Sequence, residues 1–367
     1  MINILFITAN STIGGGPEHI YSIIQNIDKE KYKPYVVAPA NGEYYERFKE
    51  IAETFSFDLK KRFLFNLYKL NSIIKEKNID ICHSHGLGAG VYSRPLKIIN
   101  KKLRVIHTFH GIYYERKEPI IKTAIILIEK MFGLLTDISI AVSNKEKEEA
   151  LKLGFQKEDK IKVIYNGIDL KKYQIDIDRR KYLKEIGLNL NEDLIFGSVA
   201  RFNIEKGHKE LIEAFKMINN WNNGTKLLLI GDGELRTEIE REIQKFGLAK
   251  EVILLGFRDD IPELLKCLDC FVSASYKEGL PYSLIEAIAS GVPVVATDIT
   301  GNNEIIIDEY DGFLCKARNA ESLYLTMVKM YYSEEKCFFI ENGKEYARSN
   351  FDISSMVKSL EEIYDII

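Results

Sequence analysis

Short apolar runs alternate with longer amphipathic runs along the whole chain, and this alternation constrains the fold more than any other feature. The short runs are rich in β-branched residues and have few charges, as expected of strands buried on both faces. The longer runs, such as HKELIEAFKMI and LRTEIEREIQKFG, have the periodicity of surface helices. Strands alternating with helices build parallel sheets that are covered by helices on both faces. The twelve runs that we interpret as strands are INILFIT, YVVAP, ICHSHG, VIHTF, DISIAVS, IKVIYN, LIFGSVA, KLLLIGDG, EVILLG, CFVSAS, VPVVAT and GFLC.

Twelve strands are too many for one small sheet, and a chain of 367 residues has room for two domains. The stretch between about residues 168 and 192 is charged and lacks a strand pattern, which favours a hinge there. We therefore predict an α/β protein with two doubly wound, Rossmann-like domains facing across a cleft. The N-terminal domain is expected over 1–168 and the C-terminal domain over 169–345. Residues 346–367 are expected to form a helix that returns to the N-terminal domain.

The composition places the chain among ordinary globular proteins, with 46% hydrophobic and 29% charged residues. The N-terminal run MINILFITAN lacks the basic start and cleavage site of a signal peptide. The most apolar later stretch, 120–135, is interrupted by three charged residues and is not expected to span a bilayer. Five scattered cysteines indicate reduced thiols, and we interpret the lone Cys267–Cys270 pair as packing rather than a zinc site. These features predict a cytoplasmic protein.

Basic residues gather in the first half of the chain. Residues 1–170 contain 26 Lys and Arg against 20 Asp and Glu, although the whole chain has a formal charge of −3. Such a balance suggests an anionic partner, either a membrane surface or a phosphate-bearing substrate, and a solvated helix face is the alternative. The basic, aromatic segment 60–78 is a candidate contact with the inner membrane face. Its apolar positions equally describe a core-facing stripe: Phe63, Leu64, Leu67, Leu70, Ile73 and Ile74.

In open parallel sheets, ligands bind at the carboxyl ends of the strands, so the loops after the strands are the candidate sites. The first such loop, NSTIGGGPEH, has three glycines that allow the backbone to approach a phosphate or sugar closely. It does not match GxGxxG, because Pro17 and Glu18 follow Gly16. A dehydrogenase is therefore disfavoured, and a tight β–α turn remains the structural alternative.

Two further loops, HSHG and HTFHG, each hold two histidines: His83 and His85 in the first, His107 and His110 in the second. Their spacing would allow metal chelation, but no Cys, Asp or Glu lies between them. Structural histidines with satisfied hydrogen bonds and histidines that contact a substrate are the other two interpretations.

The loop in GSVARFNIEKGHKELIEAF combines two cations with the start of a helix. Arg201 ends a strand, and Lys206 comes just before the expected helix. Two cations beside a helix N-terminus form a strong site for a diphosphate, although two surface cations are the alternative.

The segment SYKEGLPYSLIEAIASGVPVVAT places Glu278 and Glu286 on either side of another helix start. Gly279 permits a sharp turn, Pro281 suits the first turn of the helix, and Gly291 ends it. Two carboxylates flanking a bound diphosphate could accept hydrogen bonds from a ribose at one end and a sugar at the other. The pattern therefore fits a nucleotide sugar, provided that nearby cations outweigh the repulsion between carboxylates and phosphates.

Together these motifs resemble the retaining GT-B glycosyltransferases of family 4, whose signature E-x7-E matches Glu278 to Glu286. The resemblance covers nearly the whole chain, and its other matching segments are GGPE at 15–18, HTFHG at 107–111, AVS at 141–143, VIYNGID at 163–169, ARFNIEKG at 200–207, GDGELR at 231–236 and LGFRDDIPELL at 255–265. One departure is TGNNE at 300–304, which replaces a more common Gly-Gly form.

The resemblance implies a role for each matching residue. The expected catalytic residues are His110, Arg201, Lys206 and Glu278. The expected donor-binding residues are Gly15, Gly16, Arg201, Lys206, Arg258, Glu278, Gly279, Leu280, Pro281, Tyr282, Ser283 and Glu286. For the acceptor we expect contacts from Glu18, His83, His85 and Tyr113.

The function that follows is transfer of a sugar from a nucleotide sugar, expected to be a UDP-sugar, to a lipid-linked or glycan acceptor in cell-surface polysaccharide biosynthesis. The family implies retention of configuration. No metal is expected, because the only DxD-like run, DID at 176–178, lies in the charged hinge and not after a strand. No other cofactor and no nucleic-acid partner is expected. The alternatives are a nucleotide-sugar epimerase of the same architecture, a transferase acting on a small molecule, and a non-catalytic binding module.

Overall fold

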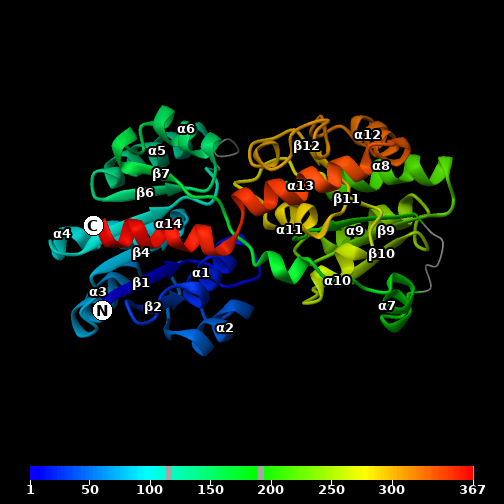
Figure 1. The fold of residues 1–367 in the computed structure, drawn as a ribbon. Coiled ribbons are helices and arrows are strands. Elements are labelled where there is room, and N and C mark those ends of the chain that lie inside the picture. Colours follow the sequence, from blue (N-terminus) through cyan, green and yellow to red (C-terminus); the bar gives the residue numbers. More distant parts are fainter. Residues whose placement is uncertain (113–117, 189–193, 367) are drawn as a thin grey trace. The chain divides into compact units, whose positions relative to one another are not determined.

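The computed structural model describes residues 1–112, 118–188 and 194–366 (Figure 1). The chain divides into two compact units. Unit 1 consists of Met1–Gly167 and Ile353–Ile367, and unit 2 consists of Ile168–Asp352. Each unit has its own parallel sheet and its own hydrophobic cores.

Unit 1 contains a seven-stranded parallel sheet with the order β3-β2-β1-β4-β5-β6-β7. Its strands are β1 (Ile2–Thr8), β2 (Tyr32–Ala38), β3 (Glu53–Ser56), β4 (Ile81–His85), β5 (Arg104–Thr108), β6 (Ile138–Ala141) and β7 (Ile161–Val163). The order reverses between β1 and β4, which pair directly in parallel. The carboxyl ends of these two strands are therefore the topological switch point of the unit.

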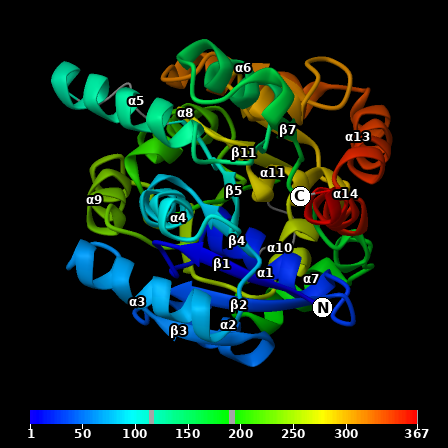
Figure 2. The ribbon, with the colours of Figure 1, turned by 90° about the vertical axis from the view of Figure 1, so that its left-hand side faces the viewer.

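Helices cover both faces of this sheet (Figures 1 and 2). They are α1 (Gly15–Asn26), α2 (Glu43–Ile51), α3 (Phe63–Glu76), α4 (Leu87–Ile99), α5 (Pro119–Gly133), α6 (Asn144–Leu153) and α14 (Ile353–Ile366), with a 3₁₀ turn at Glu158–Lys160. Because side chains alternate along a strand, Ile4 and Phe6 pack with α1, α2 and α14, whereas Leu5 and Ile7 pack with α3 and α4. Strand β1 is apolar on both faces for this reason.

The C-terminal helix α14 is held to unit 1 by polar contacts as well as by its buried face. Glu361 Oε1 accepts a hydrogen bond of 2.8 Å from the backbone of Asp28, and Lys31 Nζ lies 2.5 Å from Asp365 Oδ2. The Tyr364 hydroxyl lies 2.7 Å from His83 Nδ1, deep in the core. The last segment of the chain is thus an integral part of the first unit.

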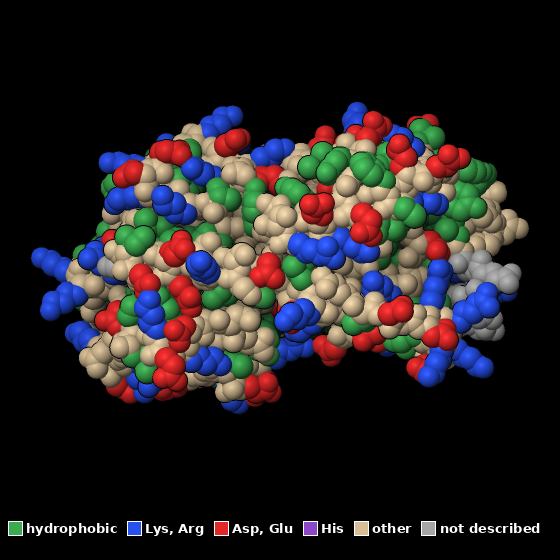
Figure 3. Space-filling model, viewed as in Figure 1, with side chains coloured by type: hydrophobic (Ala, Val, Ile, Leu, Met, Phe, Trp, Pro, Cys, Tyr) green, Lys and Arg blue, Asp and Glu red, His purple; other side chains and the backbone are tan. Residues whose placement is uncertain are grey.

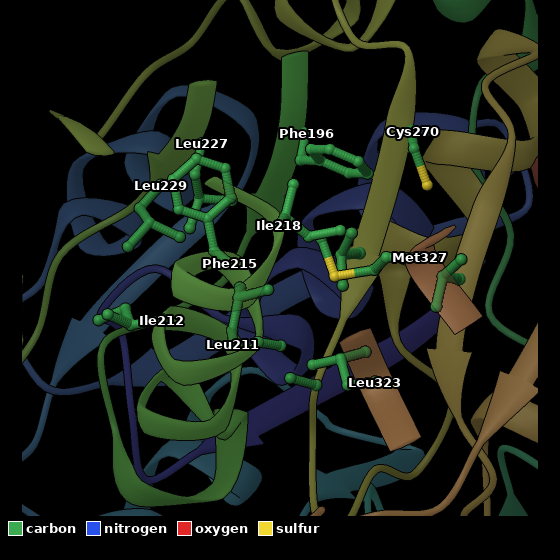
Figure 4. Close-up of a cluster of buried hydrophobic side chains, with 14 of the residues drawn as sticks. Phe196, Leu211, Ile212, Phe215, Ile218, Leu227, Leu229, Cys270, Leu323 and Met327 are labelled. Carbon is green, nitrogen blue, oxygen red and sulfur yellow. The ribbon is translucent and has the colours of Figure 1, made fainter. Parts of the chain in front are cut away.

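Unit 2 contains a six-stranded parallel sheet with the order β10-β9-β8-β11-β12-β13. Its strands are β8 (Leu194–Val199), β9 (Thr225–Ile230), β10 (Val252–Gly256), β11 (Cys270–Ser273), β12 (Val294–Thr297) and β13 (Phe313–Cys315). Its helices are α7 (Arg179–Glu185), α8 (His208–Trp221), α9 (Arg236–Lys245), α10 (Ile261–Lys266), α11 (Tyr282–Ser290), α12 (Ala320–Tyr332) and α13 (Lys336–Asn350). Short 3₁₀ turns occur at Leu170–Tyr173, Ile204–Lys206 and Asn302–Glu304. Figure 4 shows the core in which Phe215 of α8 and Met327 of α12 pack against the strands.

All twelve strands predicted from the sequence are present, and the structure adds β3 at Glu53–Ser56. This strand lies at the edge of the sheet, where one side is not paired, and three of the four residues in its sequence ETFS are polar. The apolar pattern used to find buried strands therefore missed it. Among the described residues, no helix is long and apolar enough to cross a membrane.

Candidate functional site

The predicted site residues gather at the switch point of each sheet. In unit 2, the strand order of the sheet places β9 and β10 on one side of β8, and β11, β12 and β13 on the other. The loops that follow β8 and β11 therefore leave adjacent strands at the same edge. In unit 1 the loops after β1, β4 and β5 do the same.

A glycine allows the two central loops of unit 2 to meet. Gly207 has a φ of +63°, and a Cβ atom there would lie 2.1 Å from the carbonyl oxygen of Ala274. Any other residue would collide with that backbone. The amide of Tyr276 also donates a 2.7 Å hydrogen bond to the carbonyl oxygen of Glu205, so the β8–α8 loop is fastened to the β11–α11 loop.

This contact places Lys206 against Glu278. Lys206 Nζ lies 2.5 Å from Glu278 Oε1, and the Ser275 hydroxyl donates to the same oxygen at 2.6 Å. The Glu278 side chain is 11% exposed and that of Lys206 is 21% exposed. The pair is therefore held in place but remains reachable from solvent.

Helix α11 begins four residues after Glu278. Its N-cap is Pro281, whose side chain cannot accept hydrogen bonds from the first amides of the helix. Those amides and the helix dipole favour an anion at this end. On the other side, Gly301 approaches so closely that a Cβ there would lie 2.6 Å from the carbonyl oxygen of Gly279. The segment that departs from the family pattern, 300–304, thus packs against the glutamate loop.

Glu286 lies inside α11 and is partly buried. Its Oε1 accepts a 2.9 Å hydrogen bond from the Tyr173 hydroxyl. Because Tyr173 belongs to the 3₁₀ turn at the start of unit 2, this bond ties the hinge segment to the site. In the same segment, Asp178 accepts from the amide of Lys181 as the N-cap of α7, which gives the DID run a structural role.

Both arginines that were predicted as site residues face carboxylates. Arg201 follows β8 with a side chain that is 43% exposed, and its Nη2 lies 3.7 Å from Glu234 Oε2. Arg258 donates from Nε to Asp260 Oδ1 at 2.8 Å and also pairs with the second oxygen of that carboxylate. The Arg201 side chain is the more exposed of the two, because that of Arg258 is 28% exposed.

Three histidine rings meet at the switch point of unit 1. His110 Nε2 lies 2.9 Å from His85 Nδ1 and 3.3 Å from His19 Nδ1. The rings come from three elements: α1 for His19, the end of β4 for His85, and the loop after β5 for His110. Gly16 lies beside them, since a Cβ there would be 4.0 Å from His110 Cδ2.

The backbone at His110 is unusual, with a φ of +64°. Residues other than glycine in this region carry a cost of about 1–3 kcal/mol and are concentrated at functional sites. Burial lowers the pKa of His110 to about 4, and burial with repulsion from neighbouring histidines holds the pKa of His19 and of His85 well below the usual value. All three rings are therefore neutral at pH 7.

Glu146 anchors the loop that carries His110. Its carboxylate accepts hydrogen bonds from the amides of Gly111 and, at 2.7 Å, Val142. Ser143 caps α6 by accepting from the amide of Glu146 at 3.2 Å. The sequence SNKE is thus a capping box whose glutamate reaches beyond its own helix.

Two family models together cover most of the chain. Residues 13–172 match the one described as Glycosyltransferase Family 4, and residues 178–346 match the one described as Glycosyl transferases group 1. A UDP-Gal:alpha-D-GlcNAc-diphosphoundecaprenol alpha-1,3-galactosyltransferase from Escherichia coli is 31% identical over 82% of this chain and 78% of its own length. The chain is a group 1 glycosyltransferase.

A second relative agrees with this assignment, and a solved structure shows the same fold. An N,N'-diacetylbacillosaminyl-diphospho-undecaprenol alpha-1,3-N-acetylgalactosaminyltransferase from Campylobacter jejuni is 30% identical to the glycosyltransferase over 82% of each chain. The crystal structure of Anabaena Alr3699/HepE in complex with UDP and glucose has a TM-score of 0.88 and 21% identity, with both chains covered completely. The predicted GT-B fold class is confirmed.

The glycosyltransferase brings several predicted site residues together within each unit. In unit 2, Lys206 pairs with Glu278, and the segment Gly279–Ser283 with Glu286 continues into α11. In unit 1, His85 and His110 are in contact, with Gly16 beside them and Gly15 exposed at the start of α1.

Other predicted residues are engaged in different contacts. His83 is fully buried, and its two ring nitrogens lie 2.7 Å from the Tyr364 hydroxyl and 2.8 Å from Thr108 Oγ1. Acceptor binding through His83 would require one of these bonds to break. Glu18 accepts from the hydroxyls of Tyr44 and Ser22. Tyr113 lies outside the described residues.

The sequence analysis missed three residues of these clusters: His19, Glu146 and Ser275. A signal existed for Glu146, because a serine three residues before a glutamate is a capping box. His19 follows the glycine loop by three residues, but nothing in its local sequence shows that it reaches the end of β4 and the loop after β5. Ser275 contacts Glu278 through a bend that sequence spacing does not reveal.

Proposed function

We propose that this glycosyltransferase moves a sugar from a UDP-sugar to a lipid-linked saccharide, with retention of configuration, in cell-surface polysaccharide biosynthesis. The observation that carries the proposal is the Lys206–Glu278 pair at the start of α11. A cation and a row of helix amides suit a diphosphate, and a carboxylate beside them suits sugar hydroxyls.

In the reaction, the bond between the anomeric carbon and the diphosphate oxygen breaks, and negative charge develops on the outer phosphate. Lys206, with Arg201 and the amides of α11, would stabilise that charge. The Arg201 side chain is 43% exposed, so a bound diphosphate could reach it. Glu278 would accept from hydroxyls of the transferred sugar, and Glu286 from the ribose.

Neutral His110 would contribute a hydrogen bond to a substrate hydroxyl. Its positive φ and the Glu146 anchor hold the ring in one orientation, which is the arrangement that a substrate-positioning residue needs. For the chemical step we propose front-face attack by the acceptor through an oxocarbenium-like state.

The identities of donor and acceptor are supported by relatives. The Escherichia coli relative is named for UDP-Gal and a diphosphoundecaprenol-linked sugar, and the Campylobacter jejuni relative for a diphospho-undecaprenol-linked acceptor. The Anabaena structure contains UDP and glucose. These names agree with a UDP-sugar donor and a lipid-linked acceptor for the present chain.

Donor binding and metal independence can be tested together. We expect UDP-sugars to raise the melting temperature more than GDP- or ADP-sugars, and we expect the rise to persist in EDTA. The reason is that Lys206, Arg201 and the α11 amides supply the positive charge that a metal would otherwise provide. Transfer to a lipid-linked acceptor should likewise survive EDTA. Loss of transfer in EDTA with recovery in Mn²⁺ would contradict the metal-free mechanism.

Unit 1 has a surface suited to a membrane, formed by neighbouring helices α3, α4 and α5. The predicted stripe of α3 is divided: Leu70, Ile73 and Ile74 are buried in the core, whereas Phe63 and Leu64 are exposed. The exposed apolar side chains of the surface are Phe63, Leu64, Phe65, Tyr68, Ile98, Ile99, Ile120, Ile121, Leu127, Ile128, Met131 and Leu134. Figure 2 shows the three helices on one side of the unit.

Basic side chains surround these apolar groups: Lys60, Lys61, Arg62, Lys69, Lys101, Lys102 and Lys130 are all exposed. Figure 3 shows Lys and Arg side chains projecting from the edge of the unit where α4 lies. Apolar side chains within a basic rim match the interface of an anionic bilayer. We propose that unit 1 contacts the inner membrane face through this surface.

Vesicle co-sedimentation tests the membrane surface. We expect the protein to bind vesicles that contain anionic lipids, and the double variant Leu64→Glu/Ile120→Glu to bind about tenfold less, because two charges would enter the apolar part of the interface. Leu325→Glu is the matched control, since Leu325 is 57% exposed on α12 of unit 2. High salt should weaken binding. If the protein does not bind the vesicles at any salt concentration, the proposed membrane contact is wrong.

A further inference from the structure

We propose that His19, His85 and His110 form a binding site for one divalent transition-metal ion, with Zn²⁺ as the best-suited ion. One ring nitrogen from each of the three residues lies within 4.8 Å of the others. The three residues come from separate elements at the switch point of unit 1, so the cluster is built by the fold and not by a local sequence motif.

Two of the three nitrogen separations are close to those of a tetrahedral metal site, and the third is within 4.8 Å. Zinc–nitrogen bonds of about 2.0–2.1 Å at tetrahedral angles place two ligand nitrogens about 3.3–3.4 Å apart. His110 Nε2 lies 3.3 Å from His19 Nδ1 and 2.9 Å from His85 Nδ1. Small rotations of the rings would therefore direct three lone pairs to a common point.

Hydrogen bonding alone does not satisfy this cluster. A ring nitrogen has one in-plane site, yet His110 Nε2 faces a nitrogen of His19 and a nitrogen of His85. Only one of these contacts can be a well-directed hydrogen bond at a time. The remaining nitrogens, Nε2 of His19 and Nε2 of His85, are buried and have no partner among the described residues. A cation bound by the three facing lone pairs would resolve the competition at His110.

The donor set also indicates which metals would bind. Three neutral imidazoles suit zinc, copper, nickel and cobalt, whereas magnesium, calcium and manganese prefer oxygen ligands. His19 is fully buried and His85 is 4% exposed, whereas His110 is partly exposed. A metal would therefore enter from the His110 side and keep water at its remaining position.

Metal binding and catalysis would compete for His110 if the substrate hydroxyl binds to its Nε2. In the proposed function His110 binds a substrate hydroxyl, and a metal ion on its Nε2 would prevent that contact through this nitrogen. Zinc should thus inhibit sugar transfer, although the mechanism itself requires no metal. This inhibition rests on the proposed function, whereas the metal site itself does not.

The metal site can be tested without any activity assay. The experiment uses the full chain, stripped of metal, in a Cys337→Ser background, because Cys337 is the exposed cysteine and could bind metal by itself. Titration with Co²⁺ should give the visible absorption of tetrahedral cobalt and saturate at about one ion per chain, and Zn²⁺ should displace it. Absence of a stoichiometric cobalt complex would overturn the proposal.

Two ligand variants and one control variant locate the site. His19→Ala should weaken cobalt binding at least about tenfold, because it removes one of three ligands. His107→Gln is the matched control: His107 is equally buried and bonds to Ser84 2.9 Å away, outside the cluster, so binding should be unchanged. Circular dichroism checks that both variants are folded, and His85→Gln provides a second ligand variant. A folded His19→Ala or His85→Gln protein with parental affinity would show that the metal binds elsewhere.

Zinc inhibition then separates the two proposals. If cobalt binds as expected and zinc inhibits the parent and His107→Gln to the same extent, both the site and the role of His110 are supported. If cobalt binds but zinc leaves transfer unchanged, the metal site stands and the proposed contact of substrate with His110 Nε2 fails.

Discussion

Replacing Lys206 with alanine should lower the turnover number for sugar transfer by about 10²–10³-fold, the usual cost of removing one preorganised donor to a developing anion. The ammonium group lies 2.5 Å from Glu278 and next to the helix α11, where the leaving diphosphate is proposed to bind. Its loss removes charge stabilisation in the transition state. It also leaves Glu278, which is only 11% exposed, without its counter-charge.

The measurement is steady-state transfer from a UDP-sugar, with the turnover number and KM determined separately. Lys209→Ala is the matched control, because Lys209 lies on the exposed face of α8 three residues further along. Lys206→Arg keeps the charge but not the compact ammonium geometry, so we expect partial activity. Turnover by folded Lys206→Ala within about threefold of the parent would contradict the role assigned to this residue.

The sequence predicted the fold well because every buried strand in a doubly wound sheet carries a local signature. The runs around Phe6, Leu229 and Val295 are apolar on both faces, and helices cover both faces of their sheets. The edge strand β3 lacks this signature, since none of its residues is buried and three of the four are polar. A local sequence pattern therefore predicts a strand well when both of its faces are buried, and poorly when the strand lies exposed at the edge of a sheet.

The site was less accessible to sequence reasoning, because its contacts join loops that are distant in the chain. Lys206 and Glu278 were both identified, but as separate groups around a diphosphate, and their direct pairing depends on Gly207 approaching Ala274. His19 lies on a helix with no unusual local pattern and reaches His110, 91 residues away. Such contacts follow from strand order, which periodicity does not specify.

Helix α5 carries a charge whose structural role the sequence analysis did not identify. The charge of Glu129 was interpreted as a group that keeps this apolar segment out of a bilayer. In the structure, Glu129 points inward, and its Oε2 lies 2.7 Å from Arg94 Nη1 of α4. Both side chains are 2% exposed. The helix therefore buries its acid and exposes most of its apolar residues, which is the reverse of an ordinary surface helix.

Breaking this pair should destabilise the protein more than any other single change proposed for unit 1. We expect Glu129→Ala to reduce the free energy of unfolding by about 3–5 kcal/mol, because it leaves the guanidinium of Arg94 buried without its carboxylate. The space for Arg94 is made by Gly90, where a Cβ atom would lie 2.7 Å from Nη2. The guanidinium also lies 5.2 Å from the centre of the Phe132 ring. Arg94 is thus fixed by its surroundings and cannot easily turn toward water.

The measurement is the free energy of unfolding of unit 1, determined by urea unfolding at neutral pH. Glu118→Ala is the control, since Glu118 is exposed at the start of the same helix. The double variant Arg94→Met/Glu129→Leu should recover most of the lost stability, because a buried ion pair and an apolar pair of similar volume are often close in free energy. If the double variant were less stable than Glu129→Ala, the destabilisation would come from lost packing. A loss below about 1 kcal/mol in Glu129→Ala would mean that the pair is hydrated in solution, as exposed ion pairs are.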